Sequence, residues 1–143
     1  MAQTNPTLER LDDQAGWYSK KSSWNQKCYK HLKILEIIAA ALIPFFAGIN
    51  VSSIVTGGLG VVIVVLESLQ GVYQFQSNWI SYRSTAETLK HEKYLWQAKA
   101  GPYLKSENPD ALFADRVESL LSTENSKWIT TTEQVGKTKQ QLG

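Results

Sequence analysis

Small and polar residues recur along one apolar segment at alternating four- and three-residue steps, which places them on one face of a helix. They are Ser53, Gly57, Gly60, Val64, Glu67, Gly71, Gln74 and Asn78. Small residues let helices approach closely in lipid, where packing drives association. A polar continuation of the same face suits a water-filled axis. We therefore predict that the residues of this face from Ser53 to Gln74, namely Ser53, Gly57, Gly60, Val64, Glu67, Gly71 and Gln74, line a pore. The alternative is that this face only packs against the chain's own preceding segment.

Two carboxylates border the apolar region, Glu36 just before it and Glu67 just after it. If the chain reverses near Val51, both lie at the same membrane depth. Acidic residues at such a depth mark an ion path, and a ring of them concentrates cations at a pore mouth. Lys33 is one turn from Glu36 and can neutralise it, whereas Glu67 has no basic residue within one helical turn. Glu67 is thus the predicted selectivity residue and Glu36 a second acidic site.

Other chemistry has little support in the residues. The sequence "GGLG" lacks the remaining elements of a dinucleotide fingerprint or a phosphate-binding loop. His31 and His91 lie in separate segments without a second ligand at metal spacing. The single Cys28 argues against a disulfide framework. No serine, cysteine or carboxylate forms a catalytic pattern. We expect no enzyme activity, and no cofactor, metal site or nucleic-acid partner.

The elements that position the acidic residues follow from charge segregation. Residues 37–66 contain no charge, although the whole chain of 143 residues is 20% charged. These thirty residues exceed the ~20 that cross a bilayer as one helix. A hairpin fits better, with spans of about 32–49 and 53–68, because Pro44, Gly48, Asn50, Ser52 and Ser53 supply a kink and a polar turn. The alternative is a buried helical hairpin in a soluble bundle.

Lysines predict the orientation of the hairpin. Between Gln14 and Leu35 there are five lysines and no acid, more basic residues follow the second span, and the turn is uncharged. The positive-inside rule puts both termini in the cytoplasm. No signal peptide is expected, since the first apolar run begins after residue 30 and lacks a cleavage site. The five lysines are Lys20, Lys21, Lys27, Lys30 and Lys33.

The flanks predict a cytosolic helical bundle, so the fold class is all-α. Residues 1–31 form an N-terminal cytosolic helix that starts at Asn5 and Pro6, a capping residue and a proline at the first helical position. Residues 69–143 are the cytosolic helical region: the second span continues unbroken to about residue 100, a loop covers 101–108, and a docking helix covers 109–141. One apolar stripe is predicted on the long helix: Val72, Phe75, Trp79, Tyr82, Ala86, Leu89 and Trp96. The last helix carries Phe113, Val117, Leu120, Trp128, Val135 and Leu142 at heptad-like spacing, interrupted by Glu124, Thr131 and Thr138.

The segment from Tyr82 to Trp96, "YRSTAETLKHEKYLW", holds the most local order. Its signature is Tyr82, Arg83, Ala86, Glu87, Leu89, Glu92 and Tyr94, followed by Gly101, Pro102 and Tyr103. This pattern resembles the SLATT-type two-transmembrane proteins of bacteria, and more narrowly a branch catalogued as a domain of unknown function. The resemblance covers most of the chain. It implies a pore-forming effector in the bacterial inner membrane, tied to nucleotide-signalled conflict systems.

The sequence thus predicts a two-span, homo-oligomeric membrane protein that conducts ions, with a preference for monovalent cations. Its expected partners are the lipid bilayer, further copies of the chain and an unknown cytosolic regulator. Two other functions stay open. One is a non-conducting membrane adaptor whose cytosolic helices recruit a partner, and the other is a soluble helical module.

Overall fold

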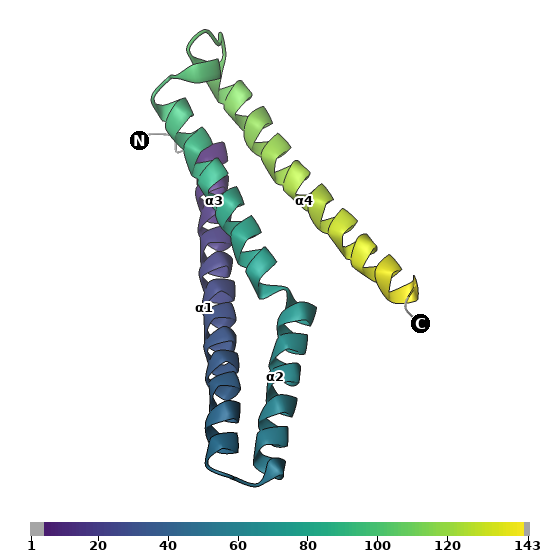
Figure 1. Cartoon of the computed structure of the whole chain (residues 1–143). Helices are drawn as coiled ribbons and strands as arrows, with labels where there is room; N and C mark the ends of the chain where they lie inside the picture. The colour runs from purple at the N-terminus through teal and green to yellow at the C-terminus, as the bar shows by residue number, and fades with distance from the viewer. Residues whose placement is uncertain (1–4, 142–143) are drawn as a thin grey trace. The chain divides into compact units, whose positions relative to one another are not determined.

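A computed structural model describes the backbone of residues 5–141 and the side chains of residues 5–127, and this part of the chain is all-α. The elements are α1 (Pro6–Gly48), α2 (Ser53–Tyr73), α3 (Phe75–Gln97), a 3₁₀ turn η1 (Gly101–Tyr103) and α4 (Pro109–Gln141) (Figure 1). They contribute to two compact units, one of residues 18–83 and one of the residues before 18 and after 83. The predicted all-α fold class is confirmed.

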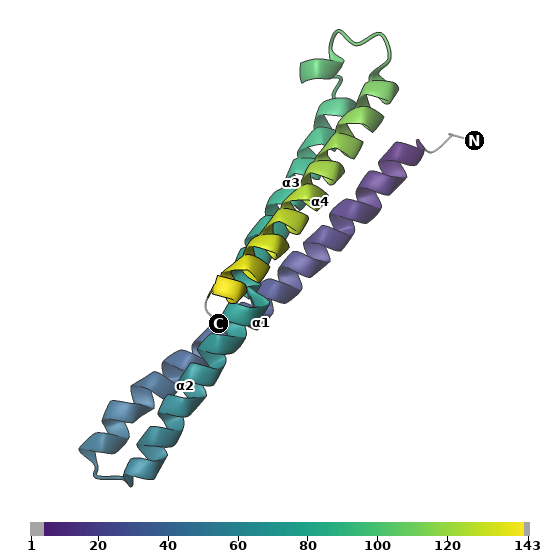
Figure 2. The same ribbon diagram turned by 90° about the vertical axis from the view of Figure 1, so that its right-hand side faces the viewer.

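Helix α1 begins as predicted, because the Asn5 side chain accepts a hydrogen bond from the Thr7 backbone N–H at 3.0 Å. It continues without a break to Gly48, with Pro44 inside its last turns. The chain then reverses through Asn50, which takes a left-handed conformation at φ 57°. The Ser52 hydroxyl caps the next helix by accepting from the Ile54 N–H at 3.3 Å. The two helices that flank this turn, the second half of α1 and α2, lie side by side in both views (Figures 1 and 2).

The second long helix is interrupted, which corrects the prediction of an unbroken helix to about residue 100. Gln74 takes a left-handed conformation, φ 48° and ψ 40°, and separates α2 from α3. The Asn78 side chain donates a 3.0 Å hydrogen bond to the Tyr73 carbonyl oxygen beside this break. No glycine or proline marks the position, and the side-chain cap satisfies a carbonyl group at the interruption. Helix α3 then ends at Gln97.

The interruption changes which residues of the predicted apolar stripe are buried. Phe75, Tyr82, Ala86 and Leu89 on α3 are buried, but Val72 on α2 is largely exposed. A helix places residues every 100°, so one residue in a different conformation rotates the face that precedes it relative to the face that follows. The stripe is therefore a property of α3 alone.

The unit formed by the chain ends has its core where α1, α3 and α4 meet. Its largest fully buried side chains are Leu11, Leu89, Phe113 and Val117. The predicted start of α4 is correct, because the Asn108 side chain accepts a hydrogen bond from the Ala111 N–H at 3.1 Å. The expected loop over 101–108 contains the short turn η1. The predicted contacts of Trp128, Val135 and Leu142 lie outside the described side chains.

Candidate functional site

The apolar helices of the hairpin are exposed rather than buried. α1 and the helical region from Ser53 onward each contain an 18-residue window of spanning length and hydropathy, and only 6% of each window is buried. A core helix of a soluble protein of that composition is mostly buried. The structure thus argues against the soluble bundle and provides two candidate membrane spans. The exposed apolar side chains on these helices include Ile34, Ile37, Ile38, Phe45, Ile54, Val61, Val62 and Val65.

The hairpin's internal contact uses a different face of α2 from most of the predicted pore-lining residues. The partly buried residues of α2 are Thr56, Leu59, Gly60, Ile63, Leu66 and Gln70. Of the predicted set, Gly60 and Gln74 are partly buried, whereas Ser53, Gly57, Val64, Glu67 and Gly71 are exposed. A methyl group built on Gly57, Gly60 or Gly71 would meet no atom within 4 Å. Intramolecular packing in the hairpin therefore does not require these glycines.

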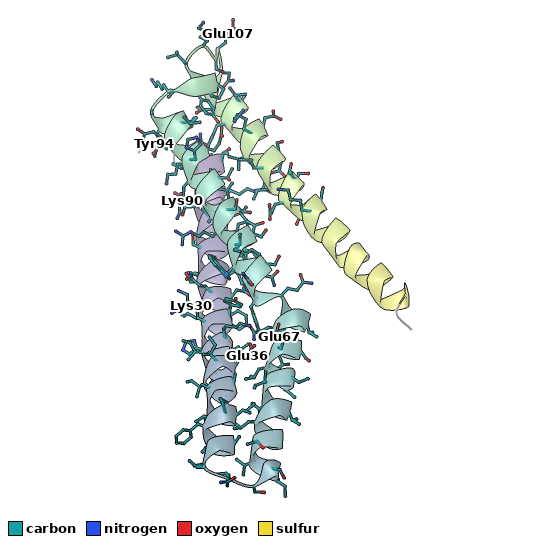
Figure 3. The ribbon with its side chains drawn as sticks, viewed as in Figure 1. Lys30, Glu36, Glu67, Lys90, Tyr94 and Glu107 are labelled. Carbon is teal, nitrogen blue, oxygen red and sulfur yellow. The ribbon has the colours of Figure 1, made fainter. Side chains whose placement is uncertain are left out.

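The two acidic residues lie at the same level of the hairpin and share one lysine. The Lys33 Nζ is 3.1 Å from a Glu36 carboxylate oxygen and 3.3 Å from a Glu67 oxygen. The Gln70 side chain also donates to Glu36, at 2.9 Å. Figure 3 shows Glu36 and Glu67 close together between α1 and α2. The reversal of the chain at Asn50 thus brings the two carboxylates to the same level of the hairpin.

This geometry corrects one premise about Glu67. Within its own helix Glu67 has no basic neighbour, but Lys33 reaches it across the hairpin. The exposures of the two carboxylates nevertheless differ: the Glu67 side chain is 63% exposed and the Glu36 side chain 16%. Glu36 is held by both Lys33 and Gln70, so its role in the structure is to join the two helices. Glu67 is therefore the more exposed of the two carboxylates.

A groove runs beside this cluster. It has a volume of about 400 Å³ and is lined by residues of α1, α2 and the start of α3, among them Lys33, Glu67, Gln70, Gly71 and Gln74. Three of these residues belong to the predicted pore-lining set. The groove therefore brings together the acidic end of that set and Lys33.

The cytosolic signature divides into buried and exposed residues. Tyr82 is buried, and its ring centroid lies 5.9 Å from that of Tyr18. Arg83, Glu87 and Tyr94 are exposed. Glu87 forms a 3.2 Å ion pair with Lys90 on its own helix. Figure 3 shows Lys90 and Tyr94 on the outside of α3.

Glu92 is the one charged member of the signature that is buried, at 3% exposure. Its carboxylate accepts hydrogen bonds from the Tyr103 hydroxyl and from the guanidinium of Arg116, including one of 3.1 Å from Nη2. These three residues come from α3, η1 and α4. Hydrogen bonds to Glu92 therefore connect three consecutive elements of one unit, and one of its partners, Tyr103, also belongs to the signature.

The electrostatics of this cluster favour its ionised form. Desolvation raises the pKa of Glu92, but hydrogen bonds from Arg116 and Tyr103 outweigh it and leave that pKa below its usual value. Burial and the hydrogen bond to Glu92 raise the pKa of the Tyr103 hydroxyl. The hydrogen bond with Glu92 likewise raises the pKa of Arg116. At neutral pH the cluster thus holds a carboxylate, a neutral phenol and a guanidinium.

Sequence reasoning missed Gln70 and Arg116. Gln70 was absent from the predicted stripe because it faces α1, and Arg116 lies 24 positions from Glu92. Apolar neighbours of Glu92 on α3 indicate that its side chain is buried, and a buried carboxylate needs a partner. This was the available signal in the sequence. The family pattern pointed to Glu92 and Tyr103 without saying that they touch.

Comparison with known proteins gives one result for this chain. No curated protein and no solved structure matches it. The family described as "Protein of unknown function (DUF4231)" matches residues 13–111, which is more than half of the chain and includes the hairpin, Glu92 and Tyr103. The chain belongs to this family of proteins of unknown function.

Proposed function

We propose that copies of this chain assemble in a membrane into an ion-conducting pore lined by α2. The observation that carries the proposal is the face of Ser53, Gly57, Val64, Glu67 and Gly71, which is exposed in the hairpin. Small residues at such a face permit close contact between helices in lipid. A polar residue on it is costly against hydrocarbon. In the proposed pore a second copy of α2 packs against the small residues of this face, and an aqueous axis solvates its polar residue.

In this pore the exposed carboxylate of Glu67 faces the cytosolic mouth and gives a preference for monovalent cations. Val64, one turn deeper and 65% exposed, forms the hydrophobic constriction that closes by dewetting. Lys33 tempers the field of Glu67, because it lies 3.3 Å from that carboxylate. Selectivity is then the balance between one exposed acid and one shared base in each subunit.

The finer assignment is that the protein is a SLATT-type effector of the bacterial inner membrane, regulated by a cytosolic factor. The hairpin followed by the Glu92 cluster supports it, since the resemblance depends on those segments in that order. Both termini are cytoplasmic in this proposal. An impermeant thiol reagent applied to intact spheroplasts should label a cysteine placed at Asn50 and miss Cys28. The reverse pattern of labelling contradicts this orientation.

Ion flux tests the pore. The purified protein is reconstituted into vesicles with a potassium gradient, and potassium efflux is followed by a fluorescent indicator. The proposal predicts efflux that depends on the protein and increases faster than linearly with its density in the membrane, because a pore needs several copies. Val64→Asn should increase efflux by wetting the constriction, while Val62→Asn, exposed on another face of α2, is the matched control.

The shared lysine favours a second candidate function, a non-conducting membrane adaptor. An acid that is neutralised by Lys33 within one subunit has less need of a water-filled axis. In that case the membrane hairpin is an anchor and the cytosolic helices carry the function. Absence of efflux from vesicles that contain folded, oriented protein contradicts the pore and supports the adaptor.

A further inference from the structure

A second groove of the hairpin unit lies between α1 and the junction of α2 with α3. Its volume is about 570 Å³, within the 300–1,000 Å³ that is typical of small-molecule sites. Its apolar wall is formed by Trp24, Leu32, Leu69, Tyr73 and Phe75. Lys27, Cys28 and His31 complete the lining. None of these residues belongs to the predicted pore-lining set, so the groove is separate from the proposed pore.

The aromatic side of the groove is a packed wall. The Phe75 ring stacks on Tyr73 with centroids 5.3 Å apart and meets the edge of Trp24 at 5.9 Å. Phe75 itself is buried, whereas Trp24 and Tyr73 are each 58% exposed. Tryptophan and tyrosine with one apolar and one wet side are typical of the headgroup level of a membrane. The wall is therefore suited to the boundary between acyl chains and headgroups.

The two ends of the groove differ in chemistry along the membrane normal. Leu32 and Leu69 lie next to the level of the Lys33–Glu67 pair, where the apolar spans begin. Trp24 is eight residues before Leu32, about 12 Å along the helix axis. The polar layer on one side of a bilayer has a thickness of roughly 5–8 Å. If the hydrocarbon begins at the level of the Lys33–Glu67 pair, the groove extends from its edge through the headgroup layer.

Lys27 supplies the polar recognition. It is exposed in the groove, and the His31 ring beside it is fixed by a 2.7 Å hydrogen bond to the Lys27 carbonyl oxygen. All charged residues of α1 between Gln14 and Leu35 are lysines. Such a juxtamembrane segment attracts anionic lipid headgroups. The charge of the groove is therefore complementary to a phosphate and not to a cation.

We propose that this groove binds one anionic membrane phospholipid, with an acyl chain along Leu32, Leu69 and Tyr73 and its phosphate on Lys27. The proposal rests on the membrane location given under the proposed function, but it does not require conduction. The apolar lining alone would accept any lipid. Lys27 makes the difference between an anionic and a zwitterionic headgroup.

The single cysteine of the chain provides the readout, because Cys28 lines the groove and is partly buried. The full-length protein in detergent is treated with N-ethylmaleimide, with phosphatidylglycerol, phosphatidylcholine or inorganic phosphate added. Phosphatidylglycerol should slow the alkylation of Cys28 about fivefold relative to phosphatidylcholine, roughly the factor that one lysine contributes near an anionic surface. Inorganic phosphate should leave the rate unchanged.

Two controls make the test specific. Lys27→Gln should remove the difference between the two lipids, whereas Lys20→Gln, which removes the same charge outside the groove, should keep it. A cysteine moved to exposed Ser23 in a Cys28→Ser background should be alkylated at the same rate in all mixtures. Equal protection by both lipids, protection by phosphate, or protection that survives Lys27→Gln overturns the proposal.

The failure of this proposal is distinguishable from the failure of the pore. Protection of Cys28 by phosphatidylglycerol without potassium efflux supports the lipid site and contradicts conduction. Potassium efflux without protection of Cys28 supports the pore and contradicts the lipid site. Circular dichroism of each variant in the same detergent verifies that the helices are intact.

Discussion

The Lys33 ammonium lies 3.3 Å from the Glu67 carboxylate, across a turn that separates them by 34 positions in sequence. Lys33 also binds Glu36, so two acids compete for one base. Glu36 keeps a second donor in Gln70. Removing the lysine therefore leaves Glu67 without the basic partner that the structure gives it.

Charge substitutions in this cluster should change ion selectivity in opposite directions. Glu67→Gln should lower cation-over-anion permeability, and Lys33→Gln should raise it. Each change should amount to roughly a factor of five, the order of the effect that a unit charge has on a neighbouring ion in water. Reversal potentials under a salt gradient measure both. Equal selectivity of both variants and the parent would show that the path lies elsewhere.

Glu36→Gln separates structure from selectivity. Its side chain is 16% exposed and joins Lys33 to Gln70. We expect a smaller effect on selectivity than for Glu67→Gln, with a lower temperature of thermal unfolding in detergent. A selectivity change as large as that of Glu67→Gln contradicts the structural role given to Glu36.

Assembly should depend on Gly57 but not on its neighbour Gly58. Both glycines are exposed in the hairpin, and neither has an atom within 4 Å of a built methyl group. Only Gly57 lies on the small-residue face. Gly57→Leu should weaken the oligomer by about 1–3 kcal/mol, the usual cost of overpacking an interface. Analytical ultracentrifugation in detergent measures it, and Gly58→Leu is the matched control. Equal effects of the two substitutions would remove this face from the interface.

The buried Glu92 should be a major stabilising residue of its unit. Glu92→Gln should lower the free energy of unfolding by about 2–3 kcal/mol, since hydrogen bonds to a charged group are lost. Glu87→Gln, on the same helix but exposed and paired only with Lys90, should change it by less than about 1 kcal/mol. Denaturant unfolding followed by circular dichroism compares the two. Similar effects of both substitutions on the free energy of unfolding would mean that the Glu92 cluster does not stabilise the unit.

The same cluster predicts how stability depends on pH. The pKa of Glu92 is lower in the folded state than its ordinary value of 4.5. Its contribution is therefore present above that value and is lost as the pH falls through the lower, folded value. Glu92→Gln should reduce this acid dependence. An unchanged loss of stability in acid would assign it to other carboxylates.

The break at Gln74 predicts an unusual response to glycine. A non-glycine residue in the left-handed conformation costs about 1–2 kcal/mol of stability, which glycine would avoid. Glycine offsets about 0.5–1 kcal/mol of this gain, because it loses more conformational entropy on folding. Gln74→Gly should therefore raise stability by about 0.5–1 kcal/mol, and Gln74→Val should lower it. Thermal unfolding in detergent tests both. Destabilisation by glycine would show that the Gln74 side chain contributes more than its backbone strain costs.

The sequence predicts those features that depend on local composition. The uncharged residues 37–66 indicate the hairpin, and Asn5 and Asn108 indicate the helix starts. The break at Gln74 has no such signal, because glutamine has no preference for a left-handed conformation and the Asn78 cap is four residues away. Contacts between distant positions, such as Arg116 with Glu92, depend on how helices dock. Spacing along one helix does not report that docking.

The two arms that enter the hairpin differ mechanically. Helix α1 has 43 residues without an interruption, so it is a stiff rod of about 65 Å. The opposite arm has a joint at Gln74, where α2 gives way to α3. Within the unit of residues 18–83, Lys33 and Glu36 thus lie on one uninterrupted helix, whereas the helix that bears Glu67 ends at Gln74. The two acidic residues are therefore carried by arms of different continuity, one a single helix and the other interrupted next to the membrane boundary.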